Sequence, residues 1–389
     1  MKSKLLHLII FIGVIFAFSA CNDSIPLPEP EPVAYKSIAI VYWMGDNTLS
    51  SAAESDIQEL VKGKDNIPDS CKIIIYADRV NDFPVIYELD AANGLKEWKK
   101  YTKEEDCTDS LTLLSNLRAI VKNFPAKSYG LTFGSHGSGW VMRQRRALGP
   151  DQSHNSNWMN IPTLRGVLEH LPHFNYIFFD VCFMQCIEVA YELRDVTDWI
   201  IGSPAEIPGP GADYRTITGA LCKGDIESIV EGYNNAYPTI HFDGVILSAT
   251  KCSELESLAA ITKTYITNAF ANRQTISSGE AQNIQKYSSS FSDYTYCYDM
   301  NSAMSNILST ASYGLWNEEF KKAVPLRKKN TGRWSSPSGI CNNPTIYDSE
   351  HFGGISMYIP QDDEEGNKKN TELRQYQWYK DAGWEQAGW

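Results

Sequence analysis

The segments YGLTFGSHGSGW (129–140) and YIFFDVCFMQCIE (176–188) decide the fold of this chain. Each begins with an apolar run rich in aromatic and β-branched residues, which is typical of a buried strand, and continues into small or polar residues where the strand ends. The first strand ends near His136 and the second near Cys182. Because buried apolar strands usually belong to parallel sheets, an imidazole and a thiol are expected at the same edge of the sheet.

A thiol beside an imidazole can act as a nucleophile, because the histidine withdraws its proton and the imidazolium stabilises the thiolate. The sequence therefore predicts His136 and Cys182 as a catalytic dyad. The alternatives are structural: a strand-end cysteine is often a buried core residue, and a histidine there can have both ring nitrogens satisfied by the fold. The glycines at 134, 137 and 139 favour the dyad, since they leave the backbone around His136 open to a ligand and allow positive φ.

The motifs HGSGW (136–140) and DVCFM (180–184), with Glu188 in the next helix, resemble the clostripain family of cysteine peptidases. The resemblance runs from Ile38 to Ile359 and includes further segments, namely IVYWMGDNTLSSAAESDIQEL (40–60), IIGSPAEIPGPGADY (200–214) and FGGISMYIP (352–360). It implies a caspase-like fold and a cysteine endopeptidase that cuts after Arg or Lys.

The resemblance also implies a pocket for the basic residue before the cut. Asp180 lies on the same side of its strand as Cys182, and Glu206 and Asp213 follow the next predicted strand. Carboxylates at these places would pair with a buried guanidinium or ammonium group. The alternative for Asp180 is a cap at the end of its strand, and Glu206 is equally compatible with an ordinary surface carboxylate.

The remaining parts of a peptidase site can also be placed. The backbone N–H groups of Gly137 and Cys182 are the expected oxyanion-hole donors, and no third, orienting residue is predicted. The polar loop VMRQRRALGPDQSHNSNW (141–158) resembles an exposed segment where nicking is tolerated. By resemblance, self-cleavage is expected after a basic residue here, most simply between Arg146 and Ala147; the alternative is that these arginines balance nearby carboxylates.

Apolar strands alternate with amphipathic helices along the chain, which predicts a mostly parallel sheet with helices on both faces, a three-layer α/β sandwich. The expected strands are 37–46, 71–78, 83–90, 94–101, 129–137, 176–182, 198–204, 243–250 and 353–360. The expected helices are 50–61, 111–123, 162–170, 185–193, 215–222, 226–237, 253–273, 277–292, 299–312 and 313–323. We assign 37–273 to a peptidase core and 274–389 to a helical lobe whose late strand returns to the core.

The N-terminus predicts export. Residues 1–20 combine a positive start, a short apolar run and small residues, which resembles a bacterial lipoprotein signal peptide with Cys21 as the lipid-modified first residue. The alternative is an ordinary signal peptide cleaved nearby. Residues 21–36 are rich in Pro and Glu and are expected to form an extended tether to the membrane of the cell envelope.

Composition limits the partners. The formal net charge of -12 over 389 residues, without a basic run, argues against nucleic acid as a partner. The nine cysteines contain no CxxC pair, and no metal site or cofactor is predicted. Whether the activity depends on calcium cannot be read from the sequence. Cys186, expected one helical turn after Cys182, is the rival nucleophile, although packing against the sheet is the favoured role.

Two other functions stay open at this level. One is a catalytically silent surface lipoprotein of the same fold that binds peptide or glycan, with 21 Tyr and 10 Trp supplying contact surface. The other is an amidase that acts on cell-wall peptide with the same dyad. The presence of both dyad residues favours a peptidase.

Overall fold

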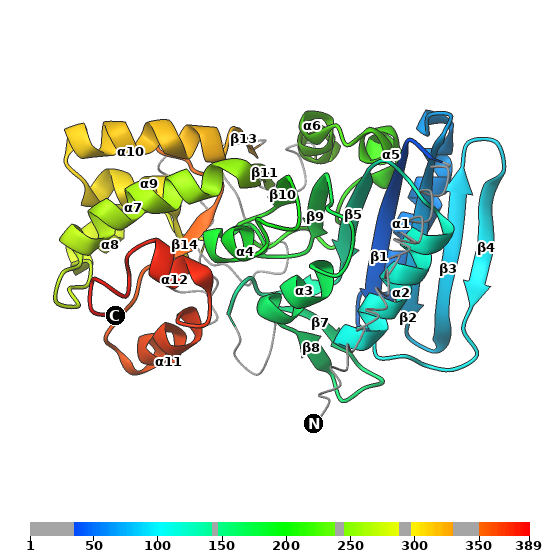
Figure 1. Ribbon diagram of the computed structural model, residues 1–389, viewed down its shortest axis with the longest axis horizontal. Coiled ribbons are helices and arrows are strands. Elements are labelled where there is room, and N and C mark those ends of the chain that lie inside the picture. Colours follow the sequence, from blue (N-terminus) through cyan, green and yellow to red (C-terminus); the bar gives the residue numbers. More distant parts are fainter. Residues whose placement is uncertain (1–34, 142–146, 238–244, 288–296, 330–349) are drawn as a thin grey trace, which may run out of the picture. The chain divides into compact units, whose positions relative to one another are not determined.

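The computed structural model describes residues 35–141, 147–237, 245–287, 297–329 and 350–389, and within them a nine-stranded sheet runs through the centre (Figure 1). Its strands are β1 (Ser37–Gly45), β2 (Cys71–Arg79), β3 (Asp82–Asp90), β4 (Gly94–Lys100), β5 (Tyr129–Gly134), β9 (Tyr176–Asp180), β10 (Trp199–Gly202), β11 (Ile246–Lys251) and β13 (Leu326–Lys329). The order across the sheet is β13-β11-β10-β9-β5-β1-β2-β3-β4. The inner strands β10, β9, β5, β1 and β2 are parallel, and the outer pairs are antiparallel.

Side chains alternate between two buried faces along the inner strands. On β1, Ile38, Ile40 and Tyr42 pack into one hydrophobic cluster, whereas Val41 and Trp43 pack into the other. This period of two, with both faces apolar, explains why the strands appear in the sequence as continuous hydrophobic runs.

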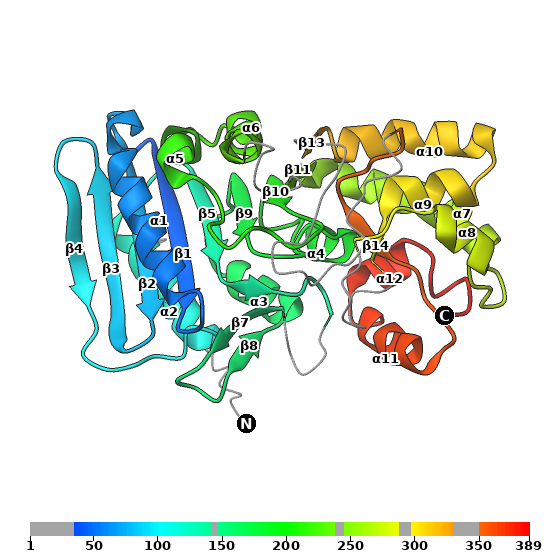
Figure 2. The ribbon, with the colours of Figure 1, turned by 180° about the vertical axis from the view of Figure 1, so that it is seen from behind.

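Helices cover both faces of the sheet, as Figures 1 and 2 show from opposite sides. One face carries α1 (Ser50–Lys62), α5 (Tyr214–Lys223) and α6 (Ile226–Ala236), and the other carries α2 (Ser110–Asn123), α3 (Ile161–Leu168) and α4 (Ile187–Glu192). The side chains of Asp109 and Asn160 cap α2 and α3 by accepting hydrogen bonds from backbone N–H groups of the first turn. The predicted three-layer α/β sandwich is confirmed.

Short strands add two small sheets that the sequence did not predict fully. One contains β6 (His136–Gly137), β7 (Leu148–Asp151) and β8 (Asn157–Met159), and the other pairs β12 (Cys297–Asp299) with β14 (Ser356–Tyr358). The late strand predicted at 353–360 is therefore β14, and its bridge to Cys186 places it beside α4 and outside the nine-stranded sheet. Strands of two to four residues are too short for a periodic signal, and β7 also contains Gly and Pro.

The remaining helices are clustered at the β13 end of the sheet (Figure 1). They are the 3₁₀ turn η2 (Cys252–Glu254), α7 (Leu255–Ala269), α8 (Ser278–Asn283), α9 (Met300–Ile307), α10 (Thr310–Ala323), α11 (Glu364–Leu373) and α12 (Gln377–Asp381), while a further 3₁₀ turn, η1 (Lys64–Asn66), follows α1. The helix α12 packs against both α4 and α7, which joins this region to the sheet. No helix in the described part of the chain is long and apolar enough to cross a membrane.

Candidate active site

The edge of the sheet positions His136. The strand β5 ends at Gly134, and His136 opens β6, where it pairs with Gly149 of β7. Between them, the Ser135 hydroxyl donates to the carbonyl oxygen of Met44 at 2.9 Å, which ties this turn to the end of β1. The histidine therefore lies on backbone held from two sides.

Cys182 is brought to the same place by strand register. Gly134 of β5 and Asp180 of β9 are paired across the two strands. His136 lies two positions after Gly134, and Cys182 lies two positions after Asp180. Gly137 lets the two segments approach closely, because a Cβ atom there would lie 2.2 Å from Cγ1 of Val181. The prediction that this glycine leaves room for a ligand is wrong, since the space is filled by the cysteine segment.

His136 and Cys182 line the same pocket, which has a volume of about 320 Å³. The lining comes from the ends of β1, β5 and β9 and from the loop after β10, and it consists of Trp43, Leu49, Ser135, His136, Asp180, Cys182, Glu206, Ile207, Pro208, Gly209, Pro210 and Gly211. The pocket is therefore at the carboxyl edge of the parallel strands, where ligands bind in open α/β sheets.

Burial keeps the Cys182 thiol protonated in this conformation, which is a resting state of the nucleophile. The backbone N–H of Ile207 donates a hydrogen bond to Sγ at 3.4 Å, which favours the thiolate but does not outweigh burial. Burial raises the pKa of the thiol to about 12, and the nearby Glu206 and Asp180 carboxylates act in the same direction. The group is accordingly a neutral thiol at pH 7 in this conformation, and thiolate formation requires a change around it.

Thr48 holds the imidazole of His136. The Thr48 hydroxyl lies 2.7 Å from Nε2. Burial lowers the pKa of His136, so that the ring is neutral at pH 7. Within the described residues no hydrogen bond joins this ring to the Cys182 thiol, so proton transfer between them requires the side chains to move closer.

Asp180 places a buried carboxylate in the pocket. It is 4% exposed. Its Oδ2 accepts hydrogen bonds from the Ala212 N–H and the Tyr214 hydroxyl, each at 3.0 Å, whereas Oδ1 accepts none. Burial raises the pKa of this carboxyl to about 6. With Glu206 also in the lining, two acidic side chains face a pocket whose lining contains no Lys or Arg among the described residues.

The other expected site residues are placed differently or lie outside the described part. Asp213 does not line the pocket; it precedes α5 and forms a 3.1 Å ion pair with Arg215. Arg146 and Cys21 lie outside the described residues, so their expected roles are not addressed by the structure. Ala147 is described and fully buried.

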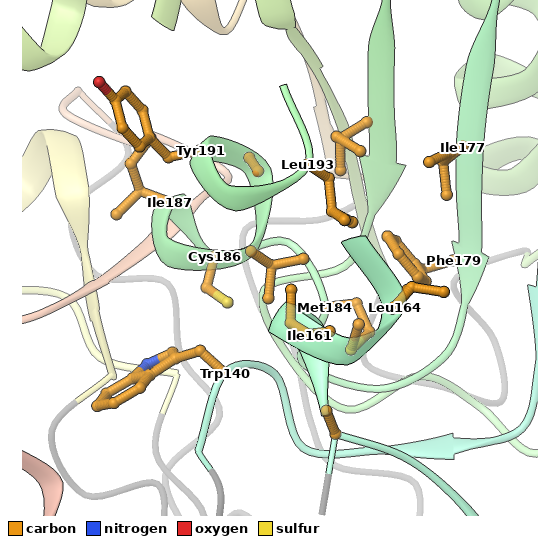
Figure 3. Close-up of a cluster of buried hydrophobic side chains, with 14 of the residues drawn as sticks. Trp140, Ile161, Leu164, Ile177, Phe179, Met184, Cys186, Ile187, Tyr191 and Leu193 are labelled. Atoms are coloured by element: carbon orange, nitrogen blue, oxygen red, sulfur yellow. The ribbon is translucent and has the colours of Figure 1, made fainter. Parts of the chain in front are cut away.

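Cys186 is a core residue that lies outside the pocket lining. It is 2% exposed and lies in the same buried cluster as Trp140 (Figure 3). The expectation that it falls one helical turn after Cys182 is wrong, because α4 begins only at Ile187 and the intervening Phe183 has φ of 62°. Packing of Cys186 against the core is confirmed.

Sequence reasoning missed Thr48 and the Ile207 amide. Thr48 lies in the polar turn after β1, which has the composition of an ordinary loop, and a backbone amide leaves no residue-type signal at all. A turn that follows a buried parallel strand at the sheet edge is the available indication that its polar side chains reach the site.

Comparisons with known proteins agree with this geometry. A model of the clostripain family matches residues 41–389. A secreted C11 cysteine protease from Bacteroides thetaiotaomicron, solved with an irreversible peptide inhibitor, is 28% identical with a TM-score of 0.77, over 90% of this chain and 99% of that one. An inactive zymogen C11 protease from Parabacteroides distasonis is 26% identical with the same TM-score and the same coverage of both chains. No curated protein sequence matches the chain.

Proposed function

Because the chain belongs to the clostripain family of cysteine peptidases, we propose that it is an exported endopeptidase that cleaves peptide bonds after Arg or Lys. Cys182 attacks the carbonyl carbon of the scissile bond, and His136 takes the thiol proton and later protonates the leaving amine. The backbone N–H groups of Gly137 and Cys182 stabilise the oxyanion. Water then hydrolyses the acyl-enzyme and regenerates the thiol.

One observation carries the preference for a basic residue, namely the Asp180 carboxylate beside Cys182. A buried carboxylate oxygen without a hydrogen-bond donor is energetically unfavourable, and Oδ1 of Asp180 is in that state. A guanidinium or ammonium group entering the pocket supplies both the donor and the opposite charge. The second carboxylate in the lining, from Glu206, favours the same kind of side chain.

Self-processing is the expected route out of the resting state. The N–H of Ser138 donates to the carbonyl oxygen of Ala147 at 3.3 Å. This hydrogen bond joins the residue directly after Arg146 to a residue two positions after His136. A cut between Arg146 and Ala147 frees one end of this attachment next to the site. The Parabacteroides distasonis relative was solved as an inactive zymogen, which supports the proposal that this chain is also made in an inactive form.

Export completes the proposal. Residues 1–20 act as a lipoprotein signal peptide, Cys21 carries the lipid, and residues 21–36 connect it to the enzyme. The secreted relative from Bacteroides thetaiotaomicron supports an extracytoplasmic site of action. Cys21→Ala should leave the enzyme unlipidated, which metabolic labelling with a fatty acid detects.

A panel of fluorogenic peptides that differ only in the residue before the cut tests the function, with and without iodoacetamide. We expect hydrolysis of the Arg and Lys peptides and its loss after alkylation. A catalytically silent binding lipoprotein hydrolyses none of them. An amidase specific for cell-wall peptide cleaves isolated muropeptides and leaves the panel intact. Either result contradicts the proposal.

A further inference from the structure

One row of residues crosses the sheet at the substrate pocket. Trp43 of β1 is paired with Gly134 of β5, and Gly134 is paired with Asp180 of β9. Because paired residues of neighbouring strands direct their side chains to the same face, Trp43 and Asp180 flank a position that has no side chain. Their backbones are about 10 Å apart, which is two strand spacings. The glycine therefore separates an aromatic ring from the buried carboxylate of the pocket.

The indole of Trp43 fills the space over Gly134. A Cβ atom on this glycine would lie 2.5 Å from Cε2, 2.6 Å from Cδ2 and 2.7 Å from Cζ2 of Trp43. These three atoms are contiguous in the ring, so one face of the indole lies over the glycine backbone. The ring thus extends from β1 across β5 in the direction of β9 and Asp180. The expectation that Gly134 leaves open space for a ligand is wrong, as it is for Gly137.

Trp43 also contributes to the lining of the pocket, although only 3% of the residue is exposed. Its indole N–H is buried and donates to no acceptor within the described residues. Packing against the glycine, without a hydrogen bond, therefore holds the ring in place. The alternative role for such a residue is core packing alone, and the ring of Tyr176 fills the space over Gly130 of β5 in that way.

The pocket combines an anionic group with an aromatic surface. Oδ1 of Asp180 has no donor, and the indole of Trp43 lies between β1 and this carboxylate. A guanidinium group is planar, weakly hydrated and stacks on aromatic rings, whereas an ammonium group is compact and strongly hydrated. Among aromatic side chains, Trp attracts cations most strongly. An Arg side chain therefore gains from both Asp180 and Trp43, while a Lys side chain gains mainly from Asp180.

We propose that Trp43 is a specificity-determining residue whose indole makes the pocket select Arg over Lys before the cut. This inference rests on the proposed function, which treats the two basic residues alike. The aliphatic part of either side chain packs against the apolar ring. Only the guanidinium of Arg also stacks on the ring while it donates to Oδ1 of Asp180.

The ratio of kcat/KM for an Arg peptide to that for the matched Lys peptide tests this role. Both values are measured on one preparation, so that the folded fraction and the contribution of the dyad cancel in the ratio. We expect a ratio of roughly 10 for the wild type and about 1 for Trp43→Leu. Trp43→Phe, which keeps a smaller ring, should give an intermediate ratio.

Gly134→Ala moves the indole without changing it. Its Cβ atom would meet Cε2 of Trp43 at 2.5 Å, so the ring must shift, and the ratio should fall roughly threefold or more. If Trp43→Leu does not fold, Gly134→Ala and Trp43→Phe provide the same test.

Leu49→Ala is the matched control. Leu49 is another apolar side chain of the pocket lining, but it has no aromatic ring. Its truncation should lower kcat/KM for both peptides by a similar factor and keep the ratio. A wild-type ratio near 1, or a ratio that the Trp43 variants and Gly134→Ala retain, overturns the proposal and assigns Trp43 to core packing.

A second measurement does not depend on hydrolysis. The n-butylguanidinium and n-butylammonium ions present the two head groups without a peptide. The first should raise the Tm of the Cys182→Ala chain more than the second, and this difference should disappear when Trp43→Leu or Gly134→Ala is added. Failure of the wild type to hydrolyse either peptide contradicts the proposed function, and the difference in Tm then decides whether Trp43 selects the guanidinium. A difference that is absent, or that survives both added substitutions, overturns the inference.

Discussion

The hydroxyl of Thr48 lies 2.7 Å from Nε2 of His136, so a residue from the turn after β1 holds the imidazole at the tip of β5. This contact exists because β1 and β5 are neighbours in the sheet. With Nε2 in contact with Thr48, the other ring nitrogen, Nδ1, is the one that could exchange a proton with a thiol. Thr48 is therefore a positioning residue for the histidine, and the dyad predicted from the sequence did not include it.

Thr48→Val should lower kcat by roughly fivefold to tenfold, the loss expected for one hydrogen bond, and leave KM nearly unchanged because Thr48 orients the base without binding substrate. Steady-state kinetics with an Arg peptide measures both constants. Thr48→Ser keeps the hydroxyl and should retain most of the activity. An equal loss in both variants contradicts a role through this hydrogen bond.

The two neighbouring cysteines should respond in opposite ways. Cys182→Ala should abolish hydrolysis, because the pocket then contains no thiol, whereas Cys186→Ala should keep most of the activity. Since Cys186 is buried, its truncation should cost about 1 kcal/mol of unfolding free energy in urea denaturation. His136→Ala should also remove activity. Turnover retained by Cys182→Ala contradicts the assignment of the nucleophile.

Substrate preference should depend on Asp180 more than on Asp213. Asp180→Asn removes a buried charge from the pocket and should lower kcat/KM for an Arg peptide roughly 30-fold or more. The matched peptide with citrulline, which has the same shape without the charge, should be nearly unaffected. Asp213→Asn should have a much smaller effect, because that carboxylate pairs with Arg215 outside the pocket lining. Equal losses for both peptides argue against charge pairing.

The preference for Arg over citrulline should also depend on pH. Burial raises the pKa of Asp180 to about 6, so below that pH the carboxyl is neutral and cannot pair with a guanidinium. The ratio of kcat/KM for the two peptides should fall about tenfold per pH unit below 6 and level off above it. Titration of the dyad cancels in this ratio. In Asp180→Asn the ratio should be flat across the same range.

The placement of His136 and Cys182 at one edge of the sheet could be predicted because each strand shows a local pattern and parallel strands share their carboxyl edge. Each residue follows a buried apolar strand, and parallel register then pairs Gly134 with Asp180 and aligns what comes next. Hydrophobic periodicity contains that information. The same pattern predicts a late strand at 353–360 but not its partner, because β14 is short and pairs with β12.

Contacts that depend on the order of strands could not be predicted in this way. Thr48 reaches His136 only because β1 lies beside β5, and Asp78 meets Asp151 only because β2 and β7 end near the same place. Asp213 was misjudged as a pocket residue because the loop after β10 has no periodicity. Its last residues turn away to start α5 at Tyr214.

Self-processing gives the last prediction. The wild-type chain should be cut between Arg146 and Ala147 and run as two fragments on a denaturing gel, because the proposed specificity selects a basic residue before the bond. The fragments should stay together in size-exclusion chromatography, since the first supplies β5 and the second β9, which pair over five residues. The Ser138 to Ala147 hydrogen bond is expected to loosen after the cut, and activity should rise as fragments appear.

Two variants separate self-cleavage from cleavage by a contaminating protease. Cys182→Ala should remain whole when purified alone and should be cut when wild-type enzyme is added, if cleavage can occur between molecules. Arg146→Gln should slow processing at this bond without changing the pocket, and Ala147 should be the N-terminal residue of the second wild-type fragment by sequencing. A chain that stays intact at full activity excludes activation by cleavage. Burial raises the pKa of the Cys182 thiol to about 12. In that case substrate binding alone, without cleavage of the chain, would have to bring about deprotonation of this thiol.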